Sequence, residues 1–151
     1  MSHIRIIVAD QAEAIFYDLS SLKAHPIEVA RMSDPAAHLH DRDFSSDRPG
    51  RSYESFGKAR HAIAGENDPR RREAVKFAKA IATRLDQDRR KKEYEQLIVV
   101  AAAPFRSLMH TEFSTDTTAC IVHEVPKDLV HSPVEVLCEH LSTTAQELKS
   151  A

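Results

Sequence analysis

The sequence predicts an α/β domain in which helices cover both faces of a mixed β-sheet, giving three layers. Short runs rich in β-branched residues come first, separated by short polar connections, which is typical of antiparallel strands. Apolar runs then alternate with segments whose apolar residues recur at helical spacing, which is typical of parallel strands joined by helical crossovers. The 151 residues fit one domain, residues 1–151, with an aliphatic core, because only 6% of them are aromatic.

Three strands are predicted near the amino terminus. The β-branched run Ile4–Ala9 predicts a buried strand that ends at Asp10. Ala14–Leu19 predicts a second strand, and the short polar connection between the two predicts a hairpin. In Ile27–Arg31, Ile27 and Val29 alternate with Glu28 and Ala30, which predicts a third strand that is half exposed.

The first helix and the fourth strand follow after a long gap. Asp68 can accept the free N–H groups of a helix, and Pro69 is favoured at the first helical position, so we expect a helix to begin there. Its apolar residues continue at helical spacing to Leu85, and the helix is expected to fade in the charged stretch Asp86–Glu95. The apolar run Leu97–Ala103 predicts a central parallel strand buried on both faces.

The last third of the chain predicts helix, strand and helix. Pro104 opens a helix, Cys120–Val125 is a fifth strand, and Ser132–Glu135 forms a capping box that opens a final helix reaching Leu148. The predicted order is therefore βββ-α-β-α-β-α, with a mixed five-stranded sheet. That order of elements is the one used by RNase H-like folds.

The connection between the third strand and the first helix is the most unusual part of the chain. From about Ser33 to Asn67 the residues follow neither strand nor helix periodicity, and all three glycines, Gly50, Gly57 and Gly65, lie here. Connections of this length without regular structure are uncommon in compact domains and are usually functional loops or disordered segments. We therefore look for functional residues in this loop first.

Several segments together carry a resemblance to a known family. Leu39–Ser52 contains the specific run SDRPGRS, and Val8–Asp10 and Arg60–Ala62 add to the pattern. With these residues the sequence resembles the bacterial host-attachment proteins. The resemblance extends over essentially the whole chain, including Phe77–Ala78 and Pro126–Leu129. The family takes its name from a phenotype, so the resemblance implies no particular chemistry.

The host-attachment family is distantly similar to the middle domain of archaeal and eukaryotic peptide-release factors, which has an RNase H-like fold. In those factors a GGQ loop between the third strand and the first helix reaches the peptidyl-transferase centre of the ribosome. The long loop of this chain falls in the corresponding place, with Pro49–Ser52 as its most similar turn, but the sequence contains no GGQ. The resemblance therefore implies association with RNA or the ribosome, and not peptide release.

Arginines of the long loop are the first candidates for such binding, because guanidinium groups offer a rigid fork of donors to phosphate. Arg48 and Arg51 flank a turn in which Gly50 favours type II geometry, which would point both side chains to one side. The candidate ligand- or RNA-binding residues are Arg42, Asp47, Arg48, Gly50, Arg51, Ser52, Arg60 and His61. The alternative is that interleaved carboxylates, such as Asp43 and Glu54, pair with these arginines and only order the loop.

Two further basic runs lie outside the loop. Arg70–Arg72 stands at the start of the predicted first helix and Arg89–Lys92 lies near its end. Either run could contact phosphate, and the alternative is that both are solvated helix ends. The formal net charge of −2 excludes a globally basic nucleic-acid binder, so any such binding must rest on local clusters.

A metal site is the second hypothesis. His38 and His40 would share one face of an extended segment and could bind one ion, so the weak candidate metal ligands are Asp10, His38, His40 and Asp41. Asp10 ends the first strand, where an RNase H-type nuclease keeps a carboxylate. The fourth strand, however, ends in Ala101–Pro104 without an acid, so the set is incomplete. The alternative for Asp10 is a cap that orients the hairpin turn.

These observations favour a binding protein over an enzyme, with no catalytic residues and no cofactor predicted. We expect a cytoplasmic RNA- or ribosome-associated domain that acts through its arginine-rich loop. The alternatives are a metal-dependent hydrolase or nuclease centred on Asp10, and a protein-interaction module.

We identify no export signal and no apolar run long enough for a membrane helix, and therefore expect no membrane partner. A homodimer through the edge strand Ile27–Arg31 is also predicted, since only Pro26 and Arg31 blunt that edge.

Overall fold

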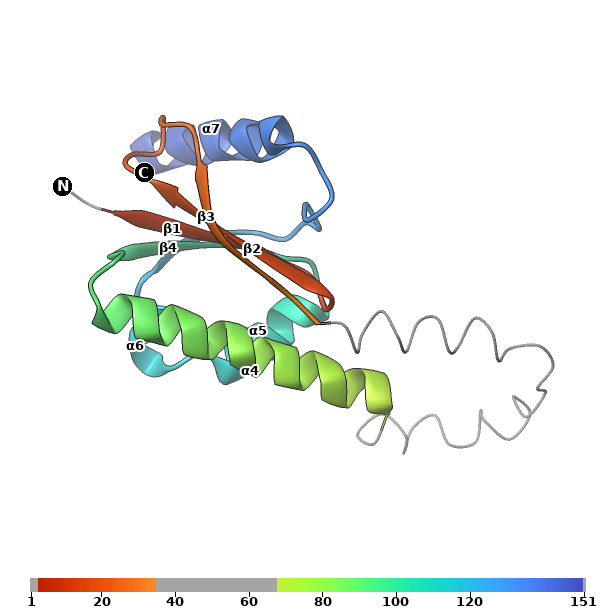
Figure 1. Ribbon diagram of the computed structural model, residues 1–151. Coiled ribbons are helices and arrows are strands. Elements are labelled where there is room, and N and C mark those ends of the chain that lie inside the picture. The colour runs from red at the N-terminus through yellow and green to blue at the C-terminus, as the bar shows by residue number, and fades with distance from the viewer. Residues whose placement is uncertain (1–2, 35–67, 151) are drawn as a thin grey trace.

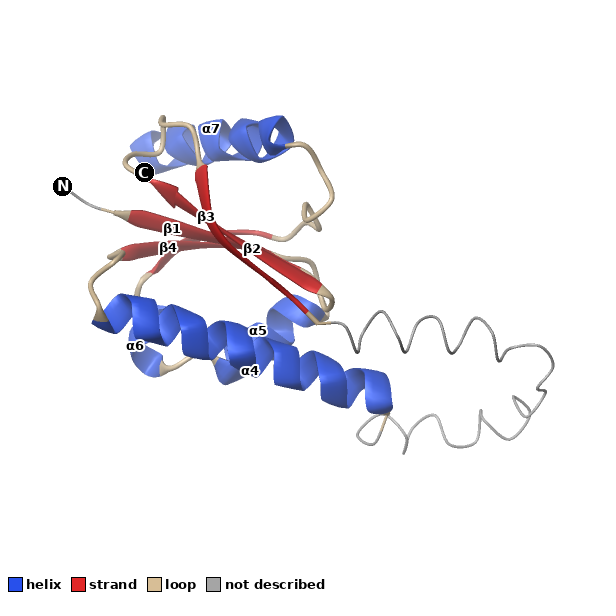
Figure 2. Cartoon of the chain, in the orientation of Figure 1, coloured by secondary structure: helices blue, strands red, loops and turns tan. Residues whose placement is uncertain are grey.

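The computed structural model has a twisted five-stranded sheet between two layers of helices (Figure 1), and it describes residues 3–34 and 68–150. Helices α4, α5 and α6 cover one face and α7 covers the other (Figure 2). In chain order the elements are β1 (Ile4–Ala9), β2 (Glu13–Leu19), β3 (Ile27–Ser33), α4 (Pro69–Arg90), β4 (Gln96–Val100), α5 (Phe105–Glu112), α6 (Thr115–Ala119), β5 (Ile121–Val125) and α7 (Val134–Ser150). Across the described ranges, no helix is both long and apolar enough to cross a membrane.

The sheet is mixed, as predicted. Its strand order is β3-β2-β1-β4-β5, with β2 antiparallel to both β1 and β3. Strands β1, β4 and β5 run parallel to one another. The antiparallel amino-terminal part and the parallel part therefore meet at β1, the central strand, which is buried along its whole length.

Each face of the sheet has its own hydrophobic layer. Ile7, Phe16 and Val99 point to the side covered by α4 and α5. Ile6 and Ile98 point to the other side, toward α7. A strand buried on both faces needs apolar residues at successive positions, which explains the unbroken apolar runs of β1 and β4.

Helix α4 begins and ends where the sequence predicts. The Asp68 side chain accepts a hydrogen bond from the Arg70 N–H at 3.0 Å, which confirms the predicted cap. The helix ends at Arg90, within the charged stretch Asp86–Glu95 in which it was expected to fade. Asp86 lies 2.7 Å from Arg89 and 3.0 Å from Arg90, and such pairs stabilise the last turns of a helix.

The carboxyl end of α4 closes with a left-handed residue. Lys92 has a φ of 62° and follows the capping residue Lys91. The N–H of Lys92 donates to the Arg89 carbonyl, and the N–H of Glu93 donates to the Asp88 carbonyl, both at 2.9 Å. This is the Schellman arrangement, in which glycine is the usual left-handed residue. A lysine in this position is conformationally unfavourable.

Strands β2, β3 and β5 differ from their predicted bounds by one or two residues, and two larger differences follow. Strand β4 ends at Val100 and not at Ala103, although the Ala101 N–H still donates to the Val125 carbonyl at 3.1 Å. The short helix α6 was not predicted, because five polar and small residues carry no apolar periodicity. It starts at Ser114, whose side chain accepts from the Thr117 N–H.

A buried arginine ties the sheet to α4. Arg5 lies in β1 and is only 1% exposed. Its guanidinium contacts Asp18 of β2 at 2.5 Å and Asp88 of α4 at 2.6 Å, with Glu93 at 3.5 Å. The guanidinium also lies 5.4 Å from the centre of the Tyr94 ring. One side chain therefore joins β1, β2, α4 and the segment after α4.

Strand β3 lies at the edge of the sheet, as predicted, but it is more exposed than the half-exposed strand that its alternation predicts. Ile27 and Val29 are 65% and 43% exposed. The register shifts between the pairs Phe16–Ala30 and Tyr17–Glu28, so Val29 is an extra residue in the edge strand. Such bulges reduce edge-to-edge pairing. Pairing with a second copy through this edge stays a prediction.

Candidate nucleic-acid interface

The side of α4 that faces away from the sheet carries many exposed cations and no exposed carboxylate. Its apolar residues, among them Phe77 and Ile81, face the sheet. Residues three or four positions apart on the opposite side are consequently exposed to solvent. We call this side the outer face of α4. It consists of the exposed residues Arg71, Arg72, Lys76, Lys79, Ala80, Thr83, Gln87 and Arg90, together with Lys91 and Lys92 at the carboxyl end.

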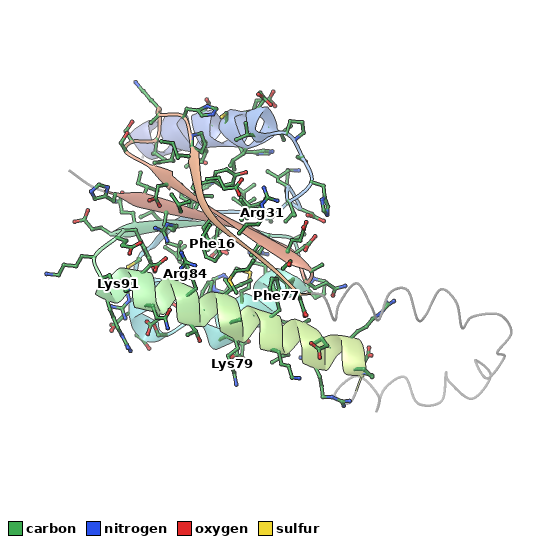
Figure 3. All side chains as sticks on the ribbon, viewed as in Figure 1. Phe16, Arg31, Phe77, Lys79, Arg84 and Lys91 are labelled. Carbon is green, nitrogen blue, oxygen red and sulfur yellow. The ribbon has the colours of Figure 1, made fainter. Side chains whose placement is uncertain are left out.

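Figure 3 shows the two sides of the helix. Phe77 and Arg84 lie between α4 and the sheet, near Phe16, whereas Lys79 points away from the sheet. The Arg84 guanidinium lies 5.4 Å from the centre of the Phe16 ring. Arg84 is therefore held at the inner side of α4, and Lys79 extends into solvent.

The carboxylates of α4 offset only part of the charge of the outer face. Glu73 pairs with Lys76 at 3.6 Å and Asp86 pairs with the last turn of the helix, and neither belongs to the exposed residues. Asp88 is 3% exposed and is held on the inner side by Arg5 and Arg84. Residues 69–92 carry ten basic and three acidic side chains, a formal charge of +7 in a chain whose net charge is −2.

Some outer-face cations are free to meet a ligand. In the part of the chain that the structure describes, no carboxylate pairs with Arg71, Lys79 or Lys91. Hydrogen bonds from Arg89 and Ser114 lower the pKa of Asp86, so this carboxylate stays ionised at neutral pH and partly offsets Arg90. The unpaired cations therefore set the positive potential of this surface.

The structure joins the two basic runs identified in the sequence. Arg71 and Arg90 lie 19 positions apart on one helix, which corresponds to about 28 Å at 1.5 Å per residue. Lys76 and Lys79 continue the charge between the runs. The sequence analysis missed these lysines, although their spacing from Arg72 is that of one helix face.

The loop residues predicted from the sequence lie outside the described ranges. These eleven residues are Arg42, Asp47, Arg48, Gly50, Arg51, Ser52, Arg60, His61, His38, His40 and Asp41. The described residues that flank this segment are Asp34, which follows β3, and Asp68, which caps α4. The Asp34 N–H donates to the Ala12 carbonyl at 2.8 Å, which places it beside the turn that follows β1.

Asp10 has the capping geometry. Its Oδ1 accepts hydrogen bonds from the N–H groups of Ala12 and Glu13, both at 2.8 Å. These bonds shape the β1–β2 turn and explain an aspartate at this position. The structure therefore supports the alternative in which Asp10 orients the hairpin.

A pocket of about 410 Å³ lies beside Asp10, at the carboxyl ends of β1 and β4. His131 stands near Asp10, with 3.9 Å between its Nε2 and the Asp10 Oδ2, and near Glu13 at 3.7 Å. The pocket is lined by Ala9, Asp10, Gln11, Ala12, Ala102, Ala103, Pro104, Phe105, Leu108, Asp128 and His131. Its two carboxylates disfavour phosphate, so this pocket does not extend the basic surface of α4.

The metal hypothesis gains no support from the described residues. Within residues 3–34 and 68–150, no three His, Cys, Asp or Glu side chains are grouped so that they could hold an ion. The predicted partners of Asp10, namely His38, His40 and Asp41, lie outside these ranges. Asp128 and His131 of the pocket were not predicted from the sequence. The feature that could have indicated them is that they follow a predicted parallel strand, at whose carboxyl end binding sites often lie.

Comparison with known proteins places the chain in a family. No curated protein matches it in sequence. A solved structure titled "Archaeal protein" matches with 10% identity and a TM-score of 0.48, over 98% of this chain. This chain spans 38% of the length of that protein. The family described as "Protein required for attachment to host cells" matches residues 5–141, and the chain therefore belongs to this host-attachment family.

Proposed function

We propose that this host-attachment family protein is a cytoplasmic RNA-binding domain that contacts the phosphate backbone with the outer face of α4. One observation carries the proposal: the exposed cations of the two basic runs and the lysines between them lie along α4, and the helix exposes no carboxylate. The positive charge is thus concentrated on one face of an otherwise acidic chain.

Phosphate contacts supply most of the affinity of a non-specific RNA-binding protein, because each cation that meets a phosphate releases a condensed counterion. A row of cations about 28 Å long can meet several phosphates at once. The inner side of α4 is fixed by apolar packing and by Arg5, so the row is presented on a rigid support. Little binding energy is then lost in ordering the surface.

The arginines predicted from the sequence would extend this surface. The segment that contains Arg48 and Arg51 is followed directly by the amino end of α4, where Arg71 and Arg72 lie. A ribosomal particle is the partner that we propose to test first, since it exposes RNA backbone at high concentration in the cytoplasm.

The first test is the salt dependence of binding to purified ribosomal RNA. We compare the wild type with Lys76→Ala/Lys79→Ala, and use Lys23→Ala/Lys127→Ala as a control with the same loss of charge. Lys23 and Lys127 are exposed and lie outside α4. The slope of log affinity against log salt should become less steep by about 2 in the first variant only, about 1 for each lost phosphate contact.

Two results would contradict the proposal. The affinity of a protein with several phosphate contacts rises by about three decades when the salt concentration falls from 200 to 50 mM. If the wild type does not bind the RNA even at 50 mM salt, the domain is therefore not an RNA-binding domain of this kind. If both variants change the slope equally, binding follows total charge and not the outer face of α4.

A second experiment addresses the ribosome. Lysates that contain the tagged wild type, the Lys76→Ala/Lys79→Ala variant or an Arg48→Ala/Arg51→Ala variant are sedimented through sucrose gradients at physiological salt. The proposal predicts that the wild type sediments with ribosomal particles and that both variants shift toward the top. A wild type that stays at the top would rule out the ribosome as the partner.

A further inference from the structure

The outer face of α4 has an internal pattern of charge. Its exposed cations form two clusters, one before Ala80 and one from Arg90 onward, and the exposed residues between the clusters are neutral, whereas the charged residues of that stretch pair with one another on the inner side or at its border. Lys79 and Arg90, the inner members of the two clusters, are 11 positions apart, or about 16 Å along the helix axis. The centre exposes Ala80, Thr83 and Gln87. The surface is therefore positive, neutral and positive along its length.

From this pattern we infer that the RNA bound by α4 is a base-paired duplex, and that α4 lies across its minor groove. This inference rests on the proposed RNA-binding function. The two cation clusters meet the two phosphate backbones that border the groove. The neutral centre, with Thr83 and Gln87, faces the strip between the backbones, where an A-form duplex displays its 2′-hydroxyl groups.

Among residues 3–34 and 68–150, no exposed aromatic side chain lies on or beside α4, which favours a duplex over a single strand at this face. Proteins that bind single strands without sequence preference stack the bases on aromatic rings. Among the described residues, Phe16, Phe77, Tyr94, Phe105 and Phe113 are buried. Tyr17 is half-buried and packs in the layer beneath α7, on the other side of the sheet. The remaining aromatic residues of the chain, Phe44, Tyr53 and Phe56, lie outside the described ranges.

The neutral centre has suitable chemistry for the 2′-hydroxyl. Thr83 and Gln87 are four positions apart and therefore lie on the same side of the helix. Neither side chain has a hydrogen-bond partner within residues 3–34 and 68–150, so both can donate to and accept from a ligand. DNA lacks the 2′-hydroxyl, and α4 should consequently prefer an RNA duplex to a DNA duplex of the same sequence.

The test measures binding of three labelled probes by fluorescence anisotropy at one salt concentration. The probes are a 20-base-pair RNA duplex, the DNA duplex of the same sequence and one strand of the RNA, and an unstructured sequence is chosen for that strand. We expect the RNA duplex to bind about 10-fold more tightly than either other probe, which is the effect of one to two good polar contacts.

Two variants separate the parts of the inference. Thr83→Ala/Gln87→Ala should bring RNA and DNA duplexes to within about twofold of each other without changing the salt slope. Lys79→Ala/Lys91→Ala removes one cation from each cluster and should weaken both duplexes while lowering the slope by about 2. All these positions are exposed, and circular dichroism and thermal melting check that the variants fold like the wild type.

Each contrary outcome has one meaning. If the single strand binds as tightly as the duplex and binding still depends on Lys79 and Lys91, the duplex inference fails and the proposed RNA-binding function stands. If RNA and DNA duplexes bind equally in the wild type, the role of Thr83 and Gln87 is wrong. If none of the three probes binds, the proposed function and the duplex inference fail together.

Discussion

The two sides of α4 use the same kinds of charged residues in opposite ways. On the inner side, Arg84 and Asp88 join Arg5 in a network in which each arginine contacts a carboxylate. On the outer side, Lys79 and Lys91 have no carboxylate partner among the described residues. A buried charge must be paired to be tolerated, whereas an exposed charge can stay unpaired at little cost. The comparison teaches that inner charges hold the fold and outer charges are available to a ligand.

The inner network keeps its charges in spite of burial. Burial alone would lower the pKa of Arg5, but hydrogen bonds and charge interactions with Asp18 and Asp88 raise it, so the guanidinium stays protonated. The neighbouring Tyr94 hydroxyl donates to the Leu85 carbonyl at 2.7 Å, and burial raises the pKa of Tyr94 to about 12. Both groups are consequently in one protonation state across the physiological pH range.

The largest expected effect comes from breaking the inner side. Arg5→Met leaves Asp88 buried without its β1 partner, and losing one member of a buried ion pair costs about 3–5 kcal/mol. Urea unfolding at pH 7 should show this loss in the free energy of unfolding. The matched outer-face variant Lys76→Ala/Lys79→Ala should change that free energy by no more than about 0.5 kcal/mol. A loss below about 1 kcal/mol in Arg5→Met would show that the network does not hold the fold.

A second, smaller effect should come from the left-handed residue at the end of α4. Lys92→Gly relieves an unfavourable backbone conformation and should stabilise the fold by about 0.5–1 kcal/mol, which raises Tm by about 1–4 °C. The same change removes a cation from the outer face and should lower the salt slope of RNA binding by about 1. Calorimetry and RNA titration on one sample measure both. A less stable variant would contradict the backbone account, and an unchanged slope would remove Lys92 from the interface.

The smallest effect concerns Asp86, which stands between the two sides. Its pKa is lowered by hydrogen bonds from Arg89 and Ser114, so its stabilising effect is present at neutral pH and is lost as the pH falls through the lowered pKa. Asp86→Asn should therefore lower the urea midpoint at pH 7 and have a much smaller effect near pH 2. An equal loss at both pH values would mean that the charge of Asp86 is not what stabilises this turn.

Much of the fold follows from local signals in the sequence. Strand β1 and the start of α4 have the predicted bounds, because an unbroken apolar run and an Asp–Pro cap need no distant partner. The sequence places the end of α4 only within the stretch Asp86–Glu95, because its last turns depend on Asp88 meeting Arg5, which lies 83 positions earlier in the chain. A single arginine within an apolar strand gives no indication of which carboxylates it will meet.

The candidate interface was only partly predictable. The basic runs at the ends of α4 are visible in the sequence, but their union on one face required the helix to continue through Arg89 and Arg90, where the sequence predicted fading. Lys76 and Lys79 follow Arg72 at helical spacing and could have been found from that pattern. The loop arginines, among them Arg48 and Arg51, remain predictions.

The most direct test of the outer face is lysine footprinting on the intact protein. Free protein and protein saturated with ribosomal RNA are briefly acetylated, and the modification of each lysine is measured by mass spectrometry. We predict that RNA protects Lys76, Lys79 and Lys91, and leaves Lys23 and Lys127 reactive. Equal protection of all these lysines, or protection confined to Lys23 and Lys127, would contradict the assignment of the outer face of α4 as the RNA-binding surface.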